Sequence, residues 1–346
     1  MKKYIAFLLA LVLSLSLWGC GDSGTDSGNT MEGLNIGYGR ADITPDFNVG
    51  LGGYSDNETR ISSGILDFLY ATCIAFTEGD KTILLITVDN LAINSSALNG
   101  AREAIPAATG VPAENIYLSA THTHSAPSLN GSNAETTKYK ELLQSGLLQA
   151  AQDALADRSP ATVAACTTEV PGMNFTRHYL LEDGSYAGPS FGNFNAAPIK
   201  EHVTETDPRM VLVKFDRIDE SKQDIVLMNW QAHPANASTN GYNNISADFV
   251  GSVRNKFERA TNMHFAYFTG ASGNQVCESK IVAEKHFLTP KQYGEKLAEH
   301  AVSVLPQLTA TESTGIKTTQ YSFTAEVDHS WDNMIDIANE VPDKLK

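Results

Sequence analysis

The sequence predicts a layered α/β domain in which helices flank one or more mixed sheets. Strand-like apolar runs alternate with helix-like segments from residue 33 to residue 346, an order typical of such layers. Of the 346 residues, 42% are apolar and 19% are charged, so the chain can bury a sizeable core. No internal repeat and no linker is evident in that range. We therefore expect one domain over residues 33–346.

The N-terminal segment is expected to lie outside this domain. Lys2 and Lys3 precede an apolar run at 4–18, whose 15 residues fall short of the roughly 20 that span a membrane. The run ends in Leu17-Trp-Gly-Cys20, which is similar to a bacterial lipobox. These features predict a lipoprotein in the bacterial cell envelope, with a signal peptide at 1–19, lipidation of Cys20 and a flexible polar tether at 20–32. The alternative is an ordinary signal peptide in which the cysteine is incidental.

The first elements of the domain have clear local signatures. Residues 34–40 alternate like a strand and stop before Pro45. Two apolar runs flank Glu78-Gly-Asp-Lys81, a strong hairpin signal. Apolar residues recur at helical spacing in 135–156. These patterns predict strands at 34–40, 70–76, 82–88 and 115–119, and helices at 95–108 and 135–156.

The remaining elements continue the alternation. Asp248 can support the first turn of a helix because a carboxylate is favourable at a helix N-terminus. An amphipathic pattern also occurs at the C-terminal end. We expect strands at 162–169, 210–215, 225–230, 264–268 and 316–326, and helices at 247–260, 290–305 and 333–341.

Charge and cysteine content argue against several protein classes. Lys and Arg number 25 against 40 Asp and Glu, and the net charge of −15 disfavours nucleic acid as a partner. Cys73, Cys166 and Cys277 show no CxxC spacing, so neither a disulfide framework nor a zinc ribbon is indicated. Cys73 and Cys166 lie in apolar runs and are expected to pack as small hydrophobic residues.

The segment Ser119-Ala-Thr-His-Thr-His-Ser-Ala-Pro127 carries the strongest chemical signal. It places His122 and His124 two residues apart where an apolar strand ends. If this segment is extended, the two side chains project to the same face. Imidazole is the commonest metal ligand and titrates near neutral pH. This spacing indicates a metal site, although such pairs also occur as hydrogen-bonded loop residues.

Two further apolar strands end in polar loops. His233 follows the strand at 225–230, and Gly270-Ala-Ser-Gly-Asn274 follows the strand at 264–268. Ligands bind beyond the carboxyl ends of strands in open α/β sheets. We therefore expect these loops to meet the HxH loop and to form a zinc site, since imidazole ligation favours zinc. A carboxylate or tyrosinate is expected to complete the ligand shell.

The chain resembles the N-terminal catalytic domain of the neutral/alkaline non-lysosomal ceramidases, which cleave the amide of N-acylsphingosines with one zinc ion. The resemblance covers about residues 35–280, and the GxGxADIT and THTHS strings are its specific parts. The matching segments are Gly37-Tyr-Gly-Arg-Ala-Asp-Ile-Thr44, Leu51-Gly-Gly-Tyr54, Ala120-Thr-His-Thr-His-Ser125, Asp207-Pro-Arg-Met210, Asn229-Trp-Gln-Ala-His-Pro234 and Ser246-Ala-Asp-Phe-Val-Gly251.

The resemblance implies a role for each matching residue. The family's zinc histidines fall on His122 and His233, and its site histidine beside the metal falls on His124. Its Arg-containing loop matches Asn174-Phe-Thr-Arg177, so Arg177 is the implied basic residue.

Two departures from the family pattern affect catalysis. Val276 stands where the family has an essential serine, and Asn274 stands where it has an aspartate. Ser272 lies four residues too early to replace that serine, and nothing local lowers the pKa of Cys277. The family's remaining zinc ligands, a glutamate and a tyrosine, lie further downstream and have no counterpart here. We expect either a C-terminally truncated, divergent member or substitution by Glu326, Asp328 and His329.

Three charged residues also have structural interpretations, and two of them, Arg40 and Asp42, match the family. Arg40 and Asp42 form a strand-end pair that favours a structural role. Asp89 could orient a histidine or cap a turn.

These observations predict a zinc-dependent hydrolase of amide or ester bonds acting on a small or lipid-like substrate. Zinc would polarise an acyl carbonyl and activate water, which attacks directly because the serine is missing. His124 would transfer the proton, and Arg177 or backbone N–H groups near Gly270, Gly273 and Asn274 would hold the oxyanion. The alternative is an inactive surface lipoprotein that binds a ligand with the inherited scaffold.

Overall fold

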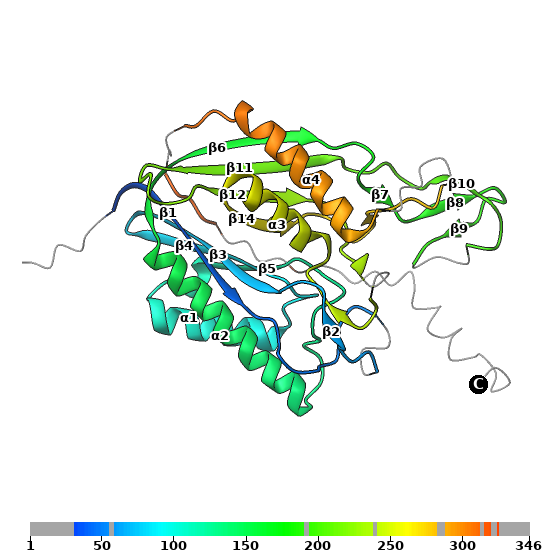
Figure 1. Ribbon diagram of the computed structural model, residues 1–346, viewed down its shortest axis with the longest axis horizontal. Helices are drawn as coiled ribbons and strands as arrows, with labels where there is room; N and C mark the ends of the chain where they lie inside the picture. Colours follow the sequence, from blue (N-terminus) through cyan, green and yellow to red (C-terminus); the bar gives the residue numbers. More distant parts are fainter. Residues whose placement is uncertain are drawn as a thin grey trace, which may run out of the picture.

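The computed structural model has four layers, with a pair of helices on each outer side and β-structure between them (Figure 1). It describes residues 31–54, 59–189, 194–237, 241–281, 288–311, 315–319 and 324. The eight principal strands form one sheet in the order β14-β12-β11-β6-β1-β3-β4-β5. Although β14 and β5 are the two edges of this order, β14 contacts β3, β4 and β5. The sheet is therefore folded over, and its two halves lie face to face.

The first half of the sheet belongs to the N-terminal part of the chain. β1 and β3 are antiparallel, β3 and β4 form the predicted hairpin, and β5 adds parallel to β4. Asn94 and Asn133 cap the two helices by accepting backbone N–H bonds, and Gly110 ends the first helix in the left-handed conformation. The elements are β1 (Met31–Asp42), β3 (Tyr70–Gly79), β4 (Lys81–Val88), α1 (Ser95–Thr109), the 3-10 turn η1 (Ala113–Asn115), β5 (Ile116–Ala120) and α2 (Ala134–Ala156).

The second half repeats this order of elements. β11 is antiparallel to both β6 and β12, and β14 adds parallel to β12. Thr289 and Gln292 form a capping box at the start of the last helix. The elements are β6 (Ser159–Glu169), β11 (Arg209–Arg217), β12 (Ile225–Trp230), α3 (Asp248–Thr261), β14 (His264–Thr269), α4 (Pro290–Val304) and the 3-10 turn η4 (Leu305–Gln307).

Short strands surround the ends of the two half-sheets. β13 pairs in parallel with β2, and β15 pairs antiparallel with β7. These elements are β2 (Gly64–Ile65), β7 (Phe175–Thr176), β8 (Tyr179–Leu181), β9 (Tyr186–Ala187), β10 (Ile199–His202), β13 (Asn244–Ile245) and β15 (Gln275–Val276).

Three hydrophobic clusters hold the four layers together. One lies between α1/α2 and the first half-sheet, and a second lies between α3/α4 and the second half-sheet. The third lies between the two half-sheets and includes Ile36, Ile74, Phe215 and Ala266. β1 and β6 share only the pairs Asn35↔Pro160 and Ile36↔Ser159, so the fold in the sheet lies at this short junction.

The layered α/β prediction is confirmed, and the predicted helices of the described range and all predicted strands but the last are present. The strand predicted at 316–326 is wrong for its described residues, because 315–319 form no ladder with the sheet. Ile316 instead packs against the cluster between the half-sheets, and its carbonyl accepts a hydrogen bond from Lys81. The predicted signal peptide, Cys20, nearly all of the tether and the helical tail lie outside the described residues, as do Glu326, Asp328 and His329.

Within the part of the chain that the structure describes, no helix has both the length and the apolar character needed to cross a membrane.

Candidate metal centre

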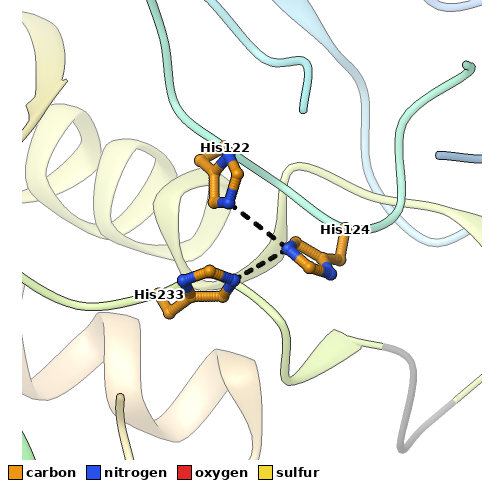
Figure 2. Close-up of side chains that lie close together, drawn as sticks. All are labelled: His122, His124 and His233. Atoms are coloured by element: carbon orange, nitrogen blue, oxygen red, sulfur yellow. Dashed lines mark hydrogen bonds between the residues drawn. The ribbon is translucent and has the colours of Figure 1, made fainter. Parts of the chain in front are cut away.

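Three histidines from the two halves of the molecule meet at one point (Figure 2). His122 and His124 lie in the loop after β5, and His233 lies in the loop after β12. The Nε2 atom of His124 is 3.4 Å from Nε2 of His122 and 2.8 Å from Nε2 of His233. One ring nitrogen from each residue lies within 4.8 Å of the other two. The structure thus brings together the histidines that the sequence placed at two strand ends.

The backbone at His122 differs from the extended loop that the sequence predicted. β5 ends at Ala120, and His122 has a φ of 68°, in the left-handed region that non-glycine residues rarely adopt. The side-chain alternation of an extended strand therefore does not determine the orientation of the two imidazole rings. The turn is fixed by hydrogen bonds from Thr121 N to Val88 O and from His122 N to Asn90 O, both 2.9 Å long. Such strain persists where the surrounding structure over-determines it, commonly at functional sites.

Backbone hydrogen bonds also fix the two histidine loops relative to each other. His124 N donates to Pro234 O at 3.0 Å, and Thr269 at the end of β14 donates its hydroxyl to Thr121 O at 2.9 Å. His233 N donates to Gln275 O at 2.8 Å, which ties this histidine to β15. All three loops after β5, β12 and β14 are therefore in contact.

Backbone carbonyl groups determine the tautomer of two of the histidines. His122 Nδ1 lies 2.7 Å from Leu91 O, and His233 Nδ1 lies 3.1 Å from Ser272 O. A carbonyl oxygen can only accept, so each Nδ1 carries the proton and each Nε2 presents a lone pair. His124 differs, because its Nδ1 is buried and has no hydrogen-bond partner among the described residues.

Burial keeps two of the rings neutral at pH 7. It lowers the pKa of His124 to about 3, and interactions with His233 and His122 when they are protonated, and with Arg177 and Arg60, act in the same direction. Burial, followed by the charges of His122 and Arg177, lowers the pKa of His233 to about 4. Neutral imidazole is the form that binds metals.

The donor set fits a divalent cation such as zinc. The Nε2 atoms of His122 and His233 are both acceptors, and a single proton on His124 Nε2 can be shared with only one of them. A cation held between the Nε2 atoms of His122 and His233 would satisfy both of these lone pairs at once, with His124 beside it. The ring nitrogens lie within 4.8 Å of one another, and neutral imidazole nitrogens are donors that zinc commonly accepts.

The other predicted site residues lie around this cluster. Arg177 N donates to Asn274 O at 2.9 Å, and its Nε is buried without a partner among the described residues. Burial lowers the pKa of Arg177, which remains cationic at pH 7. Gly270 N donates to Trp230 O, and a Cβ there would lie 2.6 Å from Gln231 Oε1, so a larger residue after β14 would displace the Gln231 side chain. Gly273 and Asn274 lead directly into β15, beside His233.

Val276, which the resemblance places at the family's serine, also lies beside the cluster, but it carries no nucleophile. Val276 forms a bridge with His233, so the residue at this position is adjacent to the site. Cys277 is 2% exposed, its Sγ lies 3.7 Å from His233 O, and burial raises the pKa of the thiol well above its usual value. Ser272 contributes its carbonyl oxygen to His233 and not a hydroxyl to the site.

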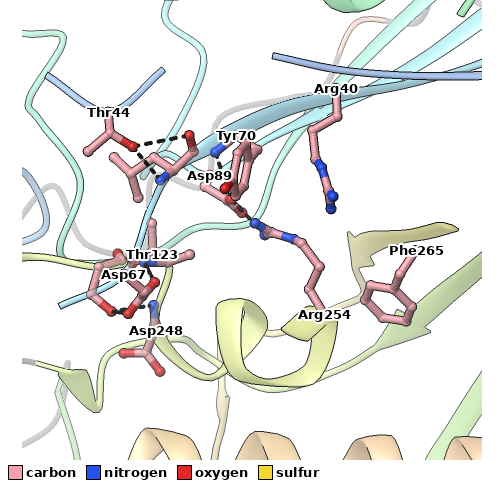
Figure 3. Close-up of polar contacts among 12 residues, drawn as sticks. Arg40, Thr44, Asp67, Tyr70, Asp89, Thr123, Asp248, Arg254 and Phe265 are labelled. Atoms are coloured by element: carbon pink, nitrogen blue, oxygen red, sulfur yellow. Dashed lines mark hydrogen bonds and ion pairs between the residues drawn. The ribbon is translucent and has the colours of Figure 1, made fainter. Parts of the chain in front are cut away.

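Arg40, Asp42 and Asp89, for which the sequence allowed a functional or a structural role, occupy structural positions. Arg40 forms an ion pair with Glu258 of α3 at 2.7 Å, and Asp42 accepts a hydrogen bond from Thr44 N. Among the described residues, Asp89 contacts no histidine, so the interpretation that it orients one of the three site histidines is wrong. It instead accepts a bond from Tyr70 N and pairs with buried Arg254 of α3 at 2.6 Å (Figure 3).

Sequence reasoning missed the residues that pack around His124. Arg60 is 1% exposed and donates to His124 O at 2.6 Å and to Gly52 O at 3.0 Å. Gly53 has a φ of 107°, and a Cβ there would lie 2.6 Å from His124 Cγ. The ring of Tyr54 meets the His124 ring edge to face at 5.1 Å. The only sequence signal for Gly53 and Tyr54 was the matching string Leu51-Gly-Gly-Tyr54. This string gave no indication that the two residues contact His124.

The sequence matches a known family, and the fold matches solved structures. The family described as neutral/alkaline non-lysosomal ceramidase, N-terminal, matches residues 34–319. A solved structure titled "Ceramidase complexed with C2" matches with a TM-score of 0.64 and 20% identity, covering 80% of this chain and 44% of that one. The neutral ceramidase from Pseudomonas aeruginosa matches with a TM-score of 0.63 and 19% identity, covering 80% of this chain and 45% of that one. This chain thus spans less than half the length of the solved ceramidases that it matches.

Proposed function

The chain belongs to the neutral/alkaline non-lysosomal ceramidase family, and from this premise we propose that it is a zinc-dependent hydrolase of amide bonds. The proposed substrate class is a lipid-like amide of the N-acylsphingosine type, and a related ester is a further substrate to test. His122 and His233 are the proposed metal ligands.

One observation carries this proposal. The Nδ1 atoms of His122 and His233 each face a backbone carbonyl, which fixes the tautomer with a free Nε2 lone pair. Metal-ligating histidines almost always donate their other ring N–H to such a partner. The same arrangement is absent at His124, whose Nδ1 has no partner among the described residues. This difference favours His122 and His233 as ligands and leaves His124 for proton transfer.

A bound zinc ion supplies Lewis-acid chemistry, polarising a carbonyl group and lowering the pKa of water. His124 is neutral at pH 7, so it can accept a proton from the attacking water and deliver it to the leaving amine. Arg177 remains charged beside the cluster and can stabilise the developing oxyanion, together with backbone N–H groups of the 270–274 loop. Val276 offers no hydroxyl, so water is the proposed nucleophile.

The test measures metal and turnover on the same sample of purified protein. We expect one zinc per chain by elemental analysis and metal-dependent release of the fluorophore from a fluorogenic ceramide. Simple acyl amides and esters define how narrow the substrate class is. A protein that binds no zinc contradicts the proposal, and zinc without cleavage of any acyl substrate overturns the hydrolase assignment.

Ligand binding without catalysis is the second candidate function. The observation that favours it is Val276, which occupies the place beside His233 where the family has its essential serine. Saturable binding of a non-hydrolysed ceramide, with no turnover even in excess zinc, is the result that supports this candidate.

The proposed location is the bacterial cell envelope, with a lipid anchor on Cys20. Its support is the basic and apolar N-terminal run that ends in Leu17-Trp-Gly-Cys20. The net charge of −15 supports the proposal that nucleic acid is not a partner. Metabolic labelling with a radioactive fatty acid tests the anchor, since Cys20→Ser should abolish labelling.

A further inference from the structure

We propose that Thr123, Ser246 and Asp248 form a buried clamp that positions the two histidine loops at the separation a metal ion requires. The clamp is defined by these three residues and by Asp67, which joins them. This inference rests on the proposed metal centre. It assigns positioning roles to residues that contact no metal ligand side chain.

The first arm of the clamp holds the loop of His122 and His124. Thr123 lies between the two histidines and is fully buried. Its Oγ1 donates to Ser246 O at 2.8 Å, and Ser246 N donates to Ser125 O at 2.9 Å. The Ser246 peptide thus binds this loop on both its donor and acceptor sides. A movement of Thr123 would carry both neighbouring histidines with it.

The second arm holds the loop of His233. Asp248 Oδ2 accepts a hydrogen bond from Ala237 N at 2.6 Å, four residues after His233. Asp248 has a φ of 59°, and its carboxylate also accepts from Phe249 N. A strained, buried carboxylate at this point is costly, and its position shows that the fold holds it there.

Asp67 and Ser246 join the two arms, and Figure 3 shows Asp67 close to Thr123 and Asp248. Ser246 Oγ donates to Asp67 Oδ2 at 2.5 Å and accepts from Asp248 N at 2.9 Å. Asp67 Oδ1 also accepts from Ala247 N at 2.6 Å. A continuous chain of buried hydrogen bonds therefore runs from Thr123 to Ala237, from one half of the molecule to the other, without passing through the metal centre.

The side chains of the clamp are polar, which indicates that they fix the relative orientation of the two loops and do not only fill space. Burial raises the pKa of Asp67 and of Asp248 to about 6, which reflects the cost of placing carboxylates here. Apolar residues of similar volume would fill the same space at lower cost. Hydrogen bonds are directional, so they can set the distance and angle between two loops. Apolar packing does not fix these quantities to the same extent.

The test compares the same substitution at two positions of one loop. Thr123→Val removes the hydroxyl that reaches Ser246 and keeps the side-chain shape. Thr121→Val is the matched control, because Thr121 Oγ1 is buried without a hydrogen-bond partner among the described residues. We expect Thr123→Val to raise the zinc dissociation constant about tenfold, the lower range found for partners outside the ligand shell. Thr121→Val should leave it within about twofold of wild type, and Thr123→Ser should restore it.

The second arm is tested independently by Asp248→Asn. Asparagine is nearly isosteric and tolerates positive φ, so the fold should persist. The amide keeps one acceptor oxygen where the carboxylate has two, and we expect weaker zinc binding and a shifted visible spectrum of the cobalt-substituted protein. Melting of the metal-free variants separates these effects from a loss of stability.

The outcomes distinguish the clamp from the metal centre. If wild type binds no zinc, the proposed metal centre fails and the clamp fails with it. If wild type binds zinc and Thr123→Val and Asp248→Asn bind it equally well, only the clamp is overturned. Equal losses in Thr121→Val and Thr123→Val would also overturn it, because they would show a general sensitivity of the loop.

Discussion

The two halves of the molecule share an order of elements but differ in what their loops carry. Each half has an antiparallel hairpin, a helix, a strand parallel to the second hairpin strand and a second helix. In the first half, histidines follow the outer strand β5. In the second half, His233 follows the inner strand β12, and a Gly-rich loop follows the outer strand β14. The same order of elements therefore places histidines at different strand ends in the two halves of the chain.

This difference shows that neither half holds a complete site. The site exists only because the folded sheet brings the end of β5 against the end of β14. Two ion pairs between α3 and the first half-sheet stabilise this arrangement, Arg254–Asp89 and Arg40–Glu258. The relative position of the halves is thus a condition for the proposed metal site and not only for stability.

Removal of one histidine from either half should have the largest effect. His122→Ala and His233→Ala should each abolish stoichiometric zinc, lowering affinity by more than about 100-fold, the upper range for partners outside the ligand shell. His124→Ala should retain zinc and lose about 10²- to 10⁴-fold in turnover, the contribution of a general acid–base group. Elemental analysis measures the zinc content of the three variants, and hydrolysis rates measure their turnover.

The matched control for these variants is His300→Ala on α4, where the ring bonds Thr168 outside the cluster. Its zinc content and turnover should equal those of wild type. Loss of zinc in His124→Ala to the same extent as in His122→Ala would show that all three histidines are ligands, and it would contradict proton transfer by His124.

The ion pairs between the halves should differ in their contribution to stability. Arg254 and Asp89 are 5% and 2% exposed, and burial raises the pKa of Asp89 even with Arg254 beside it. Arg254→Met leaves the Asp89 charge buried and unpaired, so the free energy of unfolding should fall by about 3 to 5 kcal/mol. Arg40→Met breaks a pair whose side chains are 26% and 21% exposed, and it should cost about 1 kcal/mol or less.

Urea unfolding of the two variants provides the measurement. Equal losses would show that burial does not set the strength of the contacts between the halves. The double variant Asp89→Asn with Arg254→Met should recover part of the loss, because it leaves no isolated charge.

The sequence predicted the elements whose signals are local. The hairpin at Glu78–Lys81 and the helix at 134–156 were readable because turn residues and apolar periodicity lie within a few positions of each other. The strand predicted at 316–326 had the right local pattern but no partner within its described residues, and a ladder requires a partner. Alternation alone could not reveal that difference.

The site was predicted only in part, for the same reason. His122, His124 and His233 were identifiable because their residue type and strand-end positions indicate chemistry. Their tautomers depend on carbonyl groups of Leu91 and Ser272, which reach the rings only in the folded state. The left-handed turn at His122 likewise carries no glycine or asparagine as a signal.

Two loop glycines with positive φ allow the effect of backbone strain to be separated from the effect of a contact with the site. Gly53 and Gly131 have φ values of 107° and 96°, but only at Gly53 would a Cβ meet His124; at Gly131 nothing described lies within 4 Å of it. Gly53→Ala and Gly131→Ala should both lose about 1 to 3 kcal/mol of stability from backbone strain. Only Gly53→Ala should also change the cobalt spectrum and lower turnover, because its methyl group displaces the His124 ring.

Thermal melting and cobalt absorption separate these two effects. A Gly53→Ala protein with unchanged spectrum and turnover would show that the His124 ring can shift without consequence. A spectral change in Gly131→Ala would show that strain alone reaches the site.

The smallest expected effect is a difference in pH dependence between the metal-free histidine cluster and the carboxylates of Asp67 and Asp248. The pKa values of His124 and His233 are depressed to about 3 and about 4, so their contribution to stability is present above pH 6.5 and is lost as the pH falls through 4. The pKa values of Asp67 and Asp248 are raised to about 6, so their contribution has the opposite sign: it is present below about pH 4 and is lost as the pH rises through 6.

Between pH 6.5 and 4 the two groups therefore oppose each other, and wild type should show only a modest acid loss in melting temperature with chelator present. His124→Gln removes one destabilising protonation, so its melting temperature should fall less on acidification than that of wild type. Asp248→Asn removes a compensating protonation, so its melting temperature should fall more. Parallel curves for all three proteins would show that neither group changes its protonation on unfolding, and the opposition between the two clusters would not exist.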